Sequence, residues 1–594
     1  MELLEPRKLF NGGPVSPDAA DTQRLTRTEV EQILARAGSQ ARPRQIISVV
    51  DREGNILGVY GAVNAKNVSR SAETRDGLRI PAQTLLASVA RARTAAYFQS
   101  TQNAFTTRTA RFIIQDHFPH PVPNTPGGPL YGVQFSSLPG SDVLSGPAIS
   151  GDPGGIPLYK NGVPVGGIGA AGDGHDIAAR QDLLFLSPYA ANPQRLVFDG
   201  TEESDYDERV ALAGALGFMA PEPIRANRIF LDGLRLPFTA DQPATRNPWR
   251  SLTDLLATGS GTLRNPDSVG IPFFRNSDAP RGSPGTPLFS DTPLPTASFF
   301  GVTGQYKNTA MNPADPGDDP EAASNPFGLR SVEVDRNGVA LSEAERLTVP
   351  DIKRIITRAV AQATITRAAI REPIGVHARV HIAVVDRDGE ILGVFRMQDG
   401  TNFSFDVAVQ KARTAAFFSD DAHAFSTRAV GFLAQSFFPP GIDASLPGPL
   451  RELQNQLSLQ VDPNGDFLLD AEGKPRNLKP PLRNGMTIFP GGVPLYKNGK
   501  LVGAVGISGD GVDQDDIIAF AGSLGYRPPP GIRSDQLSHQ EVIRLLRARV
   551  RFANDHFALG RVGARLLSRL DYYERNNLED VQLPYVKFPR NWEV

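Results

Sequence analysis

The sequence HIAVVDRDGEILGV at residues 381–394 occurs a second time, with few changes, as IISVVDREGNILGV at residues 46–59. Each version contains a β-branched run, a turn with a glycine and a second apolar run, and this pattern predicts a β-hairpin. Two further stretches recur in the same order, namely ARTAA at 92–96 and 412–416 and PLYKNG at 157–162 and 494–499. A self-similarity of this length indicates two copies of one compact domain.

Both copies show the same predicted order of elements. A helix comes first, followed by the hairpin, a long helix, a second hairpin with an Asn-Gly turn, and a last helix that ends at a glycine. This order is typical of an α/β (α+β) domain, with an antiparallel sheet of about five strands flanked by helices. The predicted regions are an N-terminal tail (1–24), the first repeat (25–232), a Pro/Gly-rich strap or linker (233–345), the second repeat (346–535) and a C-terminal extension (536–594). We expect the extension to begin with an amphipathic helix near residues 540–547.

The composition excludes several classes of protein. The chain has 62 Lys and Arg against 64 Asp and Glu, so it lacks the basic field expected of a nucleic-acid partner. No stretch reaches the roughly 18 apolar residues of a membrane helix, and the first residues lack the pattern of a secretory signal. The sequence as given fits a cytoplasmic protein, or an exported one whose leader has been removed. The absence of cysteine excludes disulfides, thiolate metal sites and iron–sulfur clusters.

Three blocks of the second repeat together resemble a known family. The blocks are Val384 to Asp386 with Gly389 and Gly393, then Lys411 to Phe417, then Gly491 to Gly509. This combination resembles the GlcG/HbpS-like family, also called the haem-degrading domain (DUF336). The resemblance covers most of the second repeat and, with more divergence, most of the first, but it leaves the strap and the C-terminal extension unexplained. It implies a profilin-like antiparallel sheet with flanking helices, and assembly into oligomers.

The resemblance does not fix an activity, or decide whether the chain is an enzyme. Some members of the family bind or slowly degrade haem, one branch is attached to corrinoid adenosyltransferases, and another sits with glycolate utilisation. Haem that is bound without a covalent link usually needs an axial donor in an apolar cleft, most often a histidine. The eight histidines are His117, His120, His175, His377, His381, His423, His539 and His556.

None of these histidines recurs between the repeats. His423 corresponds to Asn103 and His381 to Ile46, so a haem ligated by the same histidine in both repeats is excluded. In the second repeat, His423 is the first candidate because it follows the long helix within a Phe-rich stretch that includes Phe417. His381, on the first strand of the hairpin, is the second candidate. The alternative for both residues is that the histidine lies on the surface or packs in the core and binds no haem.

Two arginines of the second repeat, Arg413 and Arg428, do recur, as Arg93 and Arg108. A guanidinium in such a place could bind a propionate or another carboxylate with two hydrogen bonds. The alternative is a structural pair with the hairpin aspartate, Asp51 or Asp386 by repeat, that holds the helix to the hairpin.

Other motifs are weaker. The acids that follow the second hairpin, at 173–176 and 510–516, could hold Ca²⁺, but turns and helix N-termini explain them without a metal. The G-x-G-x-x-G at 167–172 follows a hairpin and is not kept in the second repeat, so it predicts close backbone packing and not a dinucleotide site.

The first hypothesis for function is therefore a haem-binding or related tetrapyrrole-binding protein. Its two repeats would pack as an intrachain pseudo-dimer, because surfaces that form a homodimer can become an internal interface after gene fusion. The second hypothesis is a scaffold or assembly protein without a cofactor, which the loss of every duplicated histidine favours. An enzyme acting on small carboxylates is the third.

Overall fold

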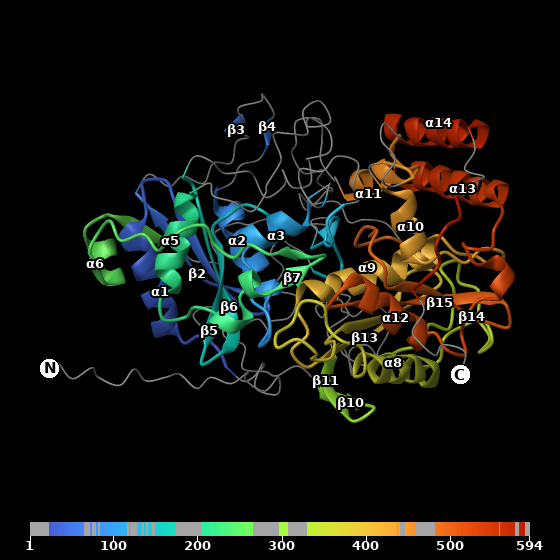
Figure 1. Ribbon diagram of the computed structural model, residues 1–594, viewed down its shortest axis with the longest axis horizontal. Helices are drawn as coiled ribbons and strands as arrows, with labels where there is room; N and C mark the ends of the chain where they lie inside the picture. Colours follow the sequence, from blue (N-terminus) through green and yellow to red (C-terminus); the bar gives the residue numbers. More distant parts are fainter. Residues whose placement is uncertain are drawn as a thin grey trace.

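Two antiparallel sheets dominate the computed structural model, one in each half of the chain (Figure 1). The described residues are 23–63, 72–73, 79–80, 84–115, 118, 127–133, 136–137, 141–144, 149–173, 204–264, 296–306, 329–435, 437–439, 446–458, 481–557, 559–576 and 581–587. Most of the predicted N-terminal tail and about half of the strap therefore lie outside them. In Figure 1 the first repeat is coloured blue to green, and the second yellow to red.

The first sheet has five strands in the order β5-β6-β1-β2-β9. Its strands are β1 (Ile46–Asp51), β2 (Ile56–Ala62), β5 (Gly155–Lys160), β6 (Val163–Ala171) and β9 (Gly261–Arg264). Its helices are α1 (Arg27–Gln40), α2 (Thr84–Tyr97), α3 (Thr107–Ile113) and α5 (Tyr206–Ala215). Successive side chains of a strand point to opposite faces. Accordingly Ile47 and Val49 share a core with α1 and α5, while Ile46 and Val50 share one with α2.

The second sheet has six strands in the order β10-β11-β13-β12-β15-β14. Its strands are β10 (Thr296–Phe299), β11 (Val302–Tyr306), β12 (His381–Asp386), β13 (Ile391–Met397), β14 (Gly492–Lys497) and β15 (Lys500–Ser508). Its helices are α8 (Val349–Ala363), α9 (Phe403–Phe417), α10 (Thr427–Leu433) and α12 (Val512–Gly522). The four strands that the sequence repeat matches follow the same order in both sheets. The α/β fold with antiparallel sheets flanked by helices is thus confirmed.

The strap contributes strands to both sheets. β9 pairs with β2 of the first sheet, and β11 pairs with β13 of the second, with β10 beyond it. The sequence predicted an extended loop here. Pairing satisfies the backbone N–H and C=O groups that β2 and β13 would otherwise expose at a sheet edge. The smaller elements are β3 (Ala72–Glu73), β4 (Arg79–Ile80), β7 (Phe230–Leu231), β8 (Leu234–Arg235), α6 (Leu252–Ala257) and the 3₁₀ turns Glu222–Ile224, Ala226–Arg228 and Pro530–Ile532.

The two repeats share a hydrophobic core. Residues of α2 such as Val89 and Ala92 lie in one buried cluster with residues of α9 such as Val407 and Ala408. At its edge the ring of Phe98 stacks on the ring of Phe403, with centroids 4.4 Å apart. Burial of aromatic rings contributes strongly to an interface, so this contact holds the repeats together.

The C-terminal extension packs on the second repeat. Its helices α13 (His539–Phe557) and α14 (Arg561–Arg575) lie beside α10 and α11 (Arg451–Ser458) in Figure 1. The predicted amphipathic helix at 540–547 is confirmed as part of α13. Leu546 and Leu566 are fully buried in one cluster with Phe418. The last described segment runs back toward α12, where Lys587 N donates to Asp516 Oδ2. Among the helices so described, none is long and apolar enough to cross a membrane.

Both first hairpins turn around an aspartate, and we predict a pH effect from Asp386, the buried one in the second repeat. Burial raises the pKa of Asp386 from 3.8 to about 7, although its Oδ1 accepts hydrogen bonds from the N–H groups of Asp388 and Glu390. The folded state then holds a proton that the unfolded chain releases near pH 4, so this group's contribution to stability is lost as pH rises from about 4 to 7. Asp386→Asn keeps the acceptor oxygen and carries no charge. We expect the variant to gain about 1–4 kcal/mol over the natural chain at pH 8, from roughly 1.4 kcal/mol per pKa unit.

Urea unfolding at pH 4.5 and pH 8 measures this difference directly. The two chains should be close in stability at the lower pH and diverge at the higher one. A constant difference across the range would show that Asp386 does not titrate in this window.

Candidate functional site

A pocket of about 560 Å³ opens at the C-terminal end of α9. Phe417 is the last residue of that helix, and His423 lies in the loop that follows it. The lining residues are Arg336, Arg387, Asp388, Ala416, Phe417, Ser419, Asp420, Asp421, Ala422, His423, Pro481, Leu501, Arg549 and Phe552. Six parts of the chain meet here: the strap, the first hairpin turn of the second repeat, the end of α9 with its loop, the segment at Pro481, the start of β15 and α13.

His423 is held by a carboxylate in this pocket. Its Nδ1 lies 2.8 Å from Asp420 Oδ1, and Arg549 Nη2 donates to Asp420 Oδ2 at 3.2 Å. Arg549 also donates to the carbonyl of Ser419 at 2.9 Å, so it ties the loop to α13. With Nδ1–H donating to the carboxylate, the lone pair of Nε2 is the one that a metal would use.

Aromatic rings and guanidinium groups form the walls. The rings of Phe417 and Phe552 lie with their centroids 5.8 Å apart. The guanidinium of Arg549 lies 5.7 Å from the Phe417 centroid, and that of Arg336 lies 5.9 Å from the Phe552 centroid. The three arginines of the lining are matched by three aspartates, Asp388, Asp420 and Asp421, so the walls combine apolar surface with charges of both signs.

The other predicted site residues lie elsewhere. His381, at the start of β12, is fully buried, and its ring stacks against Phe405 with centroids 6.1 Å apart. Arg428 pairs with Asp516 at 2.6 Å and with Asp513 at 2.7 Å on α12. The structure thus brings His423 and Phe417 together and places His381, Arg413 and Arg428 outside the pocket lining.

Arg413 makes structural contacts from the middle of α9. It donates to both oxygens of Asp142, at 2.7 and 2.8 Å, and to the carbonyl of Gly389 at 2.7 Å. Burial opposes ionisation of Asp142, but the guanidinium of Arg413 outweighs it and holds the pKa of Asp142 below its usual value. The bond to Gly389 joins the helix to the hairpin. The structural alternative expected this connection through Asp386, whereas the acceptor is the Gly389 carbonyl.

Comparison with known proteins identifies the family. The model of the family described as haem degrading protein HbpS-like matches residues 352–523. An uncharacterised 15.0 kDa protein of the dhaT-dhaS intergenic region of Citrobacter freundii is 32% identical over 165 residues, which are 26% of this chain and 88% of that protein. The chain belongs to the HbpS-like family.

Solved structures of HbpS-like proteins are also similar. A crystal structure of a PduOC:heme complex is 24% identical and covers 30% of this chain and 94% of its own, with a TM-score of 0.20. The Klebsiella pneumoniae protein ORFY is 20% identical and covers 33% of this chain and 90% of its own, with a TM-score of 0.20. A double mutant of Streptomyces reticuli HbpS is 20% identical and covers 31% and 90%, with a TM-score of 0.19.

The HbpS-like region supplies only part of the pocket. Arg387, Phe417 and His423 lie within the matched residues 352–523, whereas Arg336 and the two residues of α13 lie outside them. Sequence reasoning missed Arg336, Arg387, Arg549 and Phe552. Arg387 had a signal, because it recurs as Arg52 in the first repeat. Arg549 and Phe552 are three residues apart, which places them on one face of a helix, but nothing local shows what that face meets.

The acids after the second hairpin of the first repeat form a cluster. Carboxylate oxygens of Asp173, Asp205 and Asp207 all lie within 4.8 Å of one another. Asp205 caps α5 by accepting from the N–H of Glu208, and Asp207 accepts from Arg91 at 2.8 Å. Asp205 and Asp207 lie at the N-terminus of α5 and were not among the acids predicted at 173–176. Of those, Asp173 accepts from the N–H of Tyr206 at 3.2 Å, and residues 174–176 lie outside the described residues. The histidines His117, His120 and His175 lie outside the described residues.

Proposed function

We propose that this protein binds haem or a related tetrapyrrole in the pocket at the end of α9, with His423 as the axial ligand. The observation that carries the proposal is the pair between His423 Nδ1 and Asp420. Metal-binding histidines nearly always donate their other ring N–H to a carboxylate or carbonyl, which fixes the tautomer and raises the basicity of the ligating nitrogen. Haem would supply an iron centre, and the description of the family as haem degrading supports this choice of cofactor.

The remaining lining fits the same ligand. Phe417 and Phe552 would contact the flat macrocycle, and arginine side chains of the lining would bind propionates. The pocket volume of about 560 Å³ is typical of sites for small molecules and cofactors, which span roughly 300–1,000 Å³.

The first repeat is, in this proposal, a diverged HbpS-like domain that packs on the second as an intrachain pseudo-dimer. The shared strand order and the common core of α2 and α9 support it. Asn103 stands at the place of His423, so the first repeat would not ligate iron in this way. One ligated haem per chain is expected.

Haemin titration followed from the Soret band through the visible tests the function. We expect the natural chain to bind one haemin with a shifted band, and His423→Ala to lose that band and at least about tenfold in affinity. His377→Ala is the matched control, since His377 bonds to the Ala378 carbonyl and lies outside the lining. Asp420→Asn should weaken binding by about 10–100-fold, the usual cost of losing a carboxylate behind a ligating histidine. No saturable spectral change with the natural chain would reject the proposal and favour a scaffold without a cofactor.

A further inference from the structure

The loop after the long helix occurs twice, with the same internal bonds. In the first repeat the Tyr159 hydroxyl oxygen lies 2.8 Å from the carbonyl oxygens of both Ser100 and Asn103. In the second repeat the Tyr496 hydroxyl is placed 2.8 Å from the Asp420 carbonyl and 2.9 Å from that of His423. The next residue of each loop forms a parallel bridge, Ala104 with Arg225 and Ala424 with Arg533. The two loops are therefore equivalent, and what binds one of them is informative about the other.

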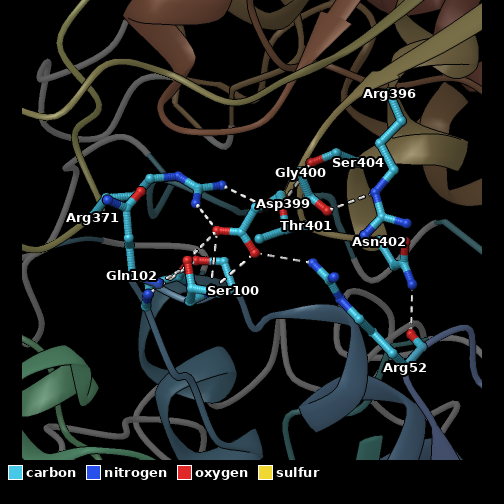
Figure 2. Close-up of polar contacts among 12 residues, drawn as sticks. Arg52, Ser100, Gln102, Arg371, Arg396, Asp399, Gly400, Thr401, Asn402 and Ser404 are labelled. Carbon is cyan, nitrogen blue, oxygen red and sulfur yellow. Dashed lines mark hydrogen bonds and ion pairs between the residues drawn. The ribbon is translucent and has the colours of Figure 1, made fainter. Parts of the chain in front are cut away.

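In the first repeat this loop holds a carboxylate from the second repeat. The N–H of Thr101 lies 3.0 and 3.1 Å from the two carboxylate oxygens of Asp399, and its hydroxyl donates to Oδ2 at 2.8 Å. Arg52, from the hairpin turn, donates to Oδ1 at 3.2 Å. Figure 2 shows Asp399 between Arg52 on one side and Arg371 on the other. Asp399 is completely buried, so the loop and Arg52 together make a built carboxylate site.

In the second repeat the equivalent groups line the pocket. Arg387 corresponds to Arg52, Asp421 to Thr101 and His423 to Asn103. The side chain of Arg387 is 36% exposed, and its one ion pair among the described residues is with Asp335 of the strap at 3.3 Å. The surface that binds Asp399 in one repeat is thus open to solvent and ligands in the other.

The acids of the lining are engaged by other groups. Asp388 lies 3.5 Å from Arg336, and Asp420 is bonded to His423. Asp421 replaces a threonine, and its Oδ1 accepts from the N–H of Leu501 at 2.9 Å, which directs the carboxylate to the neighbouring hairpin. Arg387 is the arginine of the lining that corresponds to Arg52, the residue that binds a carboxylate in the first repeat.

We propose that Arg387 and the N-terminal side of the loop at 419–423 form a carboxylate subsite of the pocket. The subsite prefers ligands with a free carboxylate beside an aromatic body, and esterification, which removes the charge, weakens their binding. This inference rests on the proposed function in so far as a tetrapyrrole is the ligand, but the subsite itself follows from the repeat.

Metal-free protoporphyrin IX and its dimethyl ester test the subsite without iron, so ligation by His423 does not contribute. Binding is followed by porphyrin fluorescence for the natural chain, Arg387→Gln and Arg547→Gln. The last variant is a control with the same charge change, because Arg547 pairs with Asp571 and Glu574 and lies outside the lining. We expect the natural chain and the control to prefer the free acid by about tenfold or more, and Arg387→Gln to bind acid and ester alike. Circular dichroism checks that all three chains are folded.

Each result has a distinct meaning. Equal binding of acid and ester by the natural chain would overturn the subsite and leave the haemin result untouched. If neither porphyrin binds, the haemin titration alone decides the proposed function, and calorimetry with isophthalate decides the subsite. Binding of isophthalate that Arg387→Gln abolishes would support it, and the absence of binding would overturn it.

Discussion

Asp399→Ala is expected to lower the free energy of unfolding by about 3–5 kcal/mol, the usual cost of removing one partner of a buried ion pair. The carboxylate of Asp399 is completely buried and accepts from Arg52 and Arg371, whose side chains are 9% and 0% exposed. After the substitution the guanidinium of Arg371 keeps Asp510, but Arg52 loses this carboxylate in a site with little water. The N–H of Thr101 also loses its acceptor. The interactions that are lost are ones that connect the two repeats.

Urea unfolding followed by two probes measures this effect. Asp571→Ala is the matched control, because Asp571 is 54% exposed and pairs with Arg547 on the surface, where an ion pair contributes about 0–1 kcal/mol. We expect Asp399→Ala to shift the transition strongly and to separate it into two steps, as the repeats unfold independently. A shift no larger than that of the control would show that the buried cluster does not hold the repeats together.

The hairpins and their order could be predicted because their signals are local. The sequence around Asp386 carries a β-branched run, a glycine turn and a second run within fourteen residues, and both turns form as expected. The strands β9 to β11 could not be predicted. They are short and are stabilised by the free edges of β2 and β13, which are distant in sequence. The sequence around these strands is rich in glycine and proline, which is typical of loops.

The candidate site could likewise be predicted only where its signals are local in the sequence. His423 and Phe417 could be singled out because they are close in sequence, at one end of a helix. The carboxylate partner of Arg413 was expected to be Asp386 and is Asp142, which could not be predicted because it is 271 residues away in the chain. Nor could α13 be placed against the loop, since an amphipathic face shows that a helix packs but not on what. Recurrence between the repeats is a further signal. Arg387 recurs as Arg52, and this recurrence would have indicated one wall of the pocket.

Leu546→Ala is expected to affect stability and ligand binding together, because α13 carries both a core residue and a pocket wall. Leu546 is completely buried in the cluster that joins α13 and α14 to the second repeat. Replacing such a leucine by alanine costs about 2–5 kcal/mol. Arg549, on the next turn of α13, holds Asp420 against His423. When α13 is loosened, the carboxylate behind His423 loses this support, so haemin affinity should fall by about tenfold.

Hydrogen exchange and haemin titration on the same samples measure the two effects. We expect faster exchange in α13 and α14 of Leu546→Ala, weaker haemin binding, and slower exchange in the same helices when haemin is added to the natural chain. Arg544→Ala, on the exposed face of α13, is the control and should change stability by no more than about 0.5 kcal/mol. If Leu546→Ala loosens α13 and leaves haemin affinity unchanged, the ligand does not use the wall that α13 provides. Binding would then depend on the HbpS-like region alone, and the extension would serve only to cover the apolar surface around Phe418.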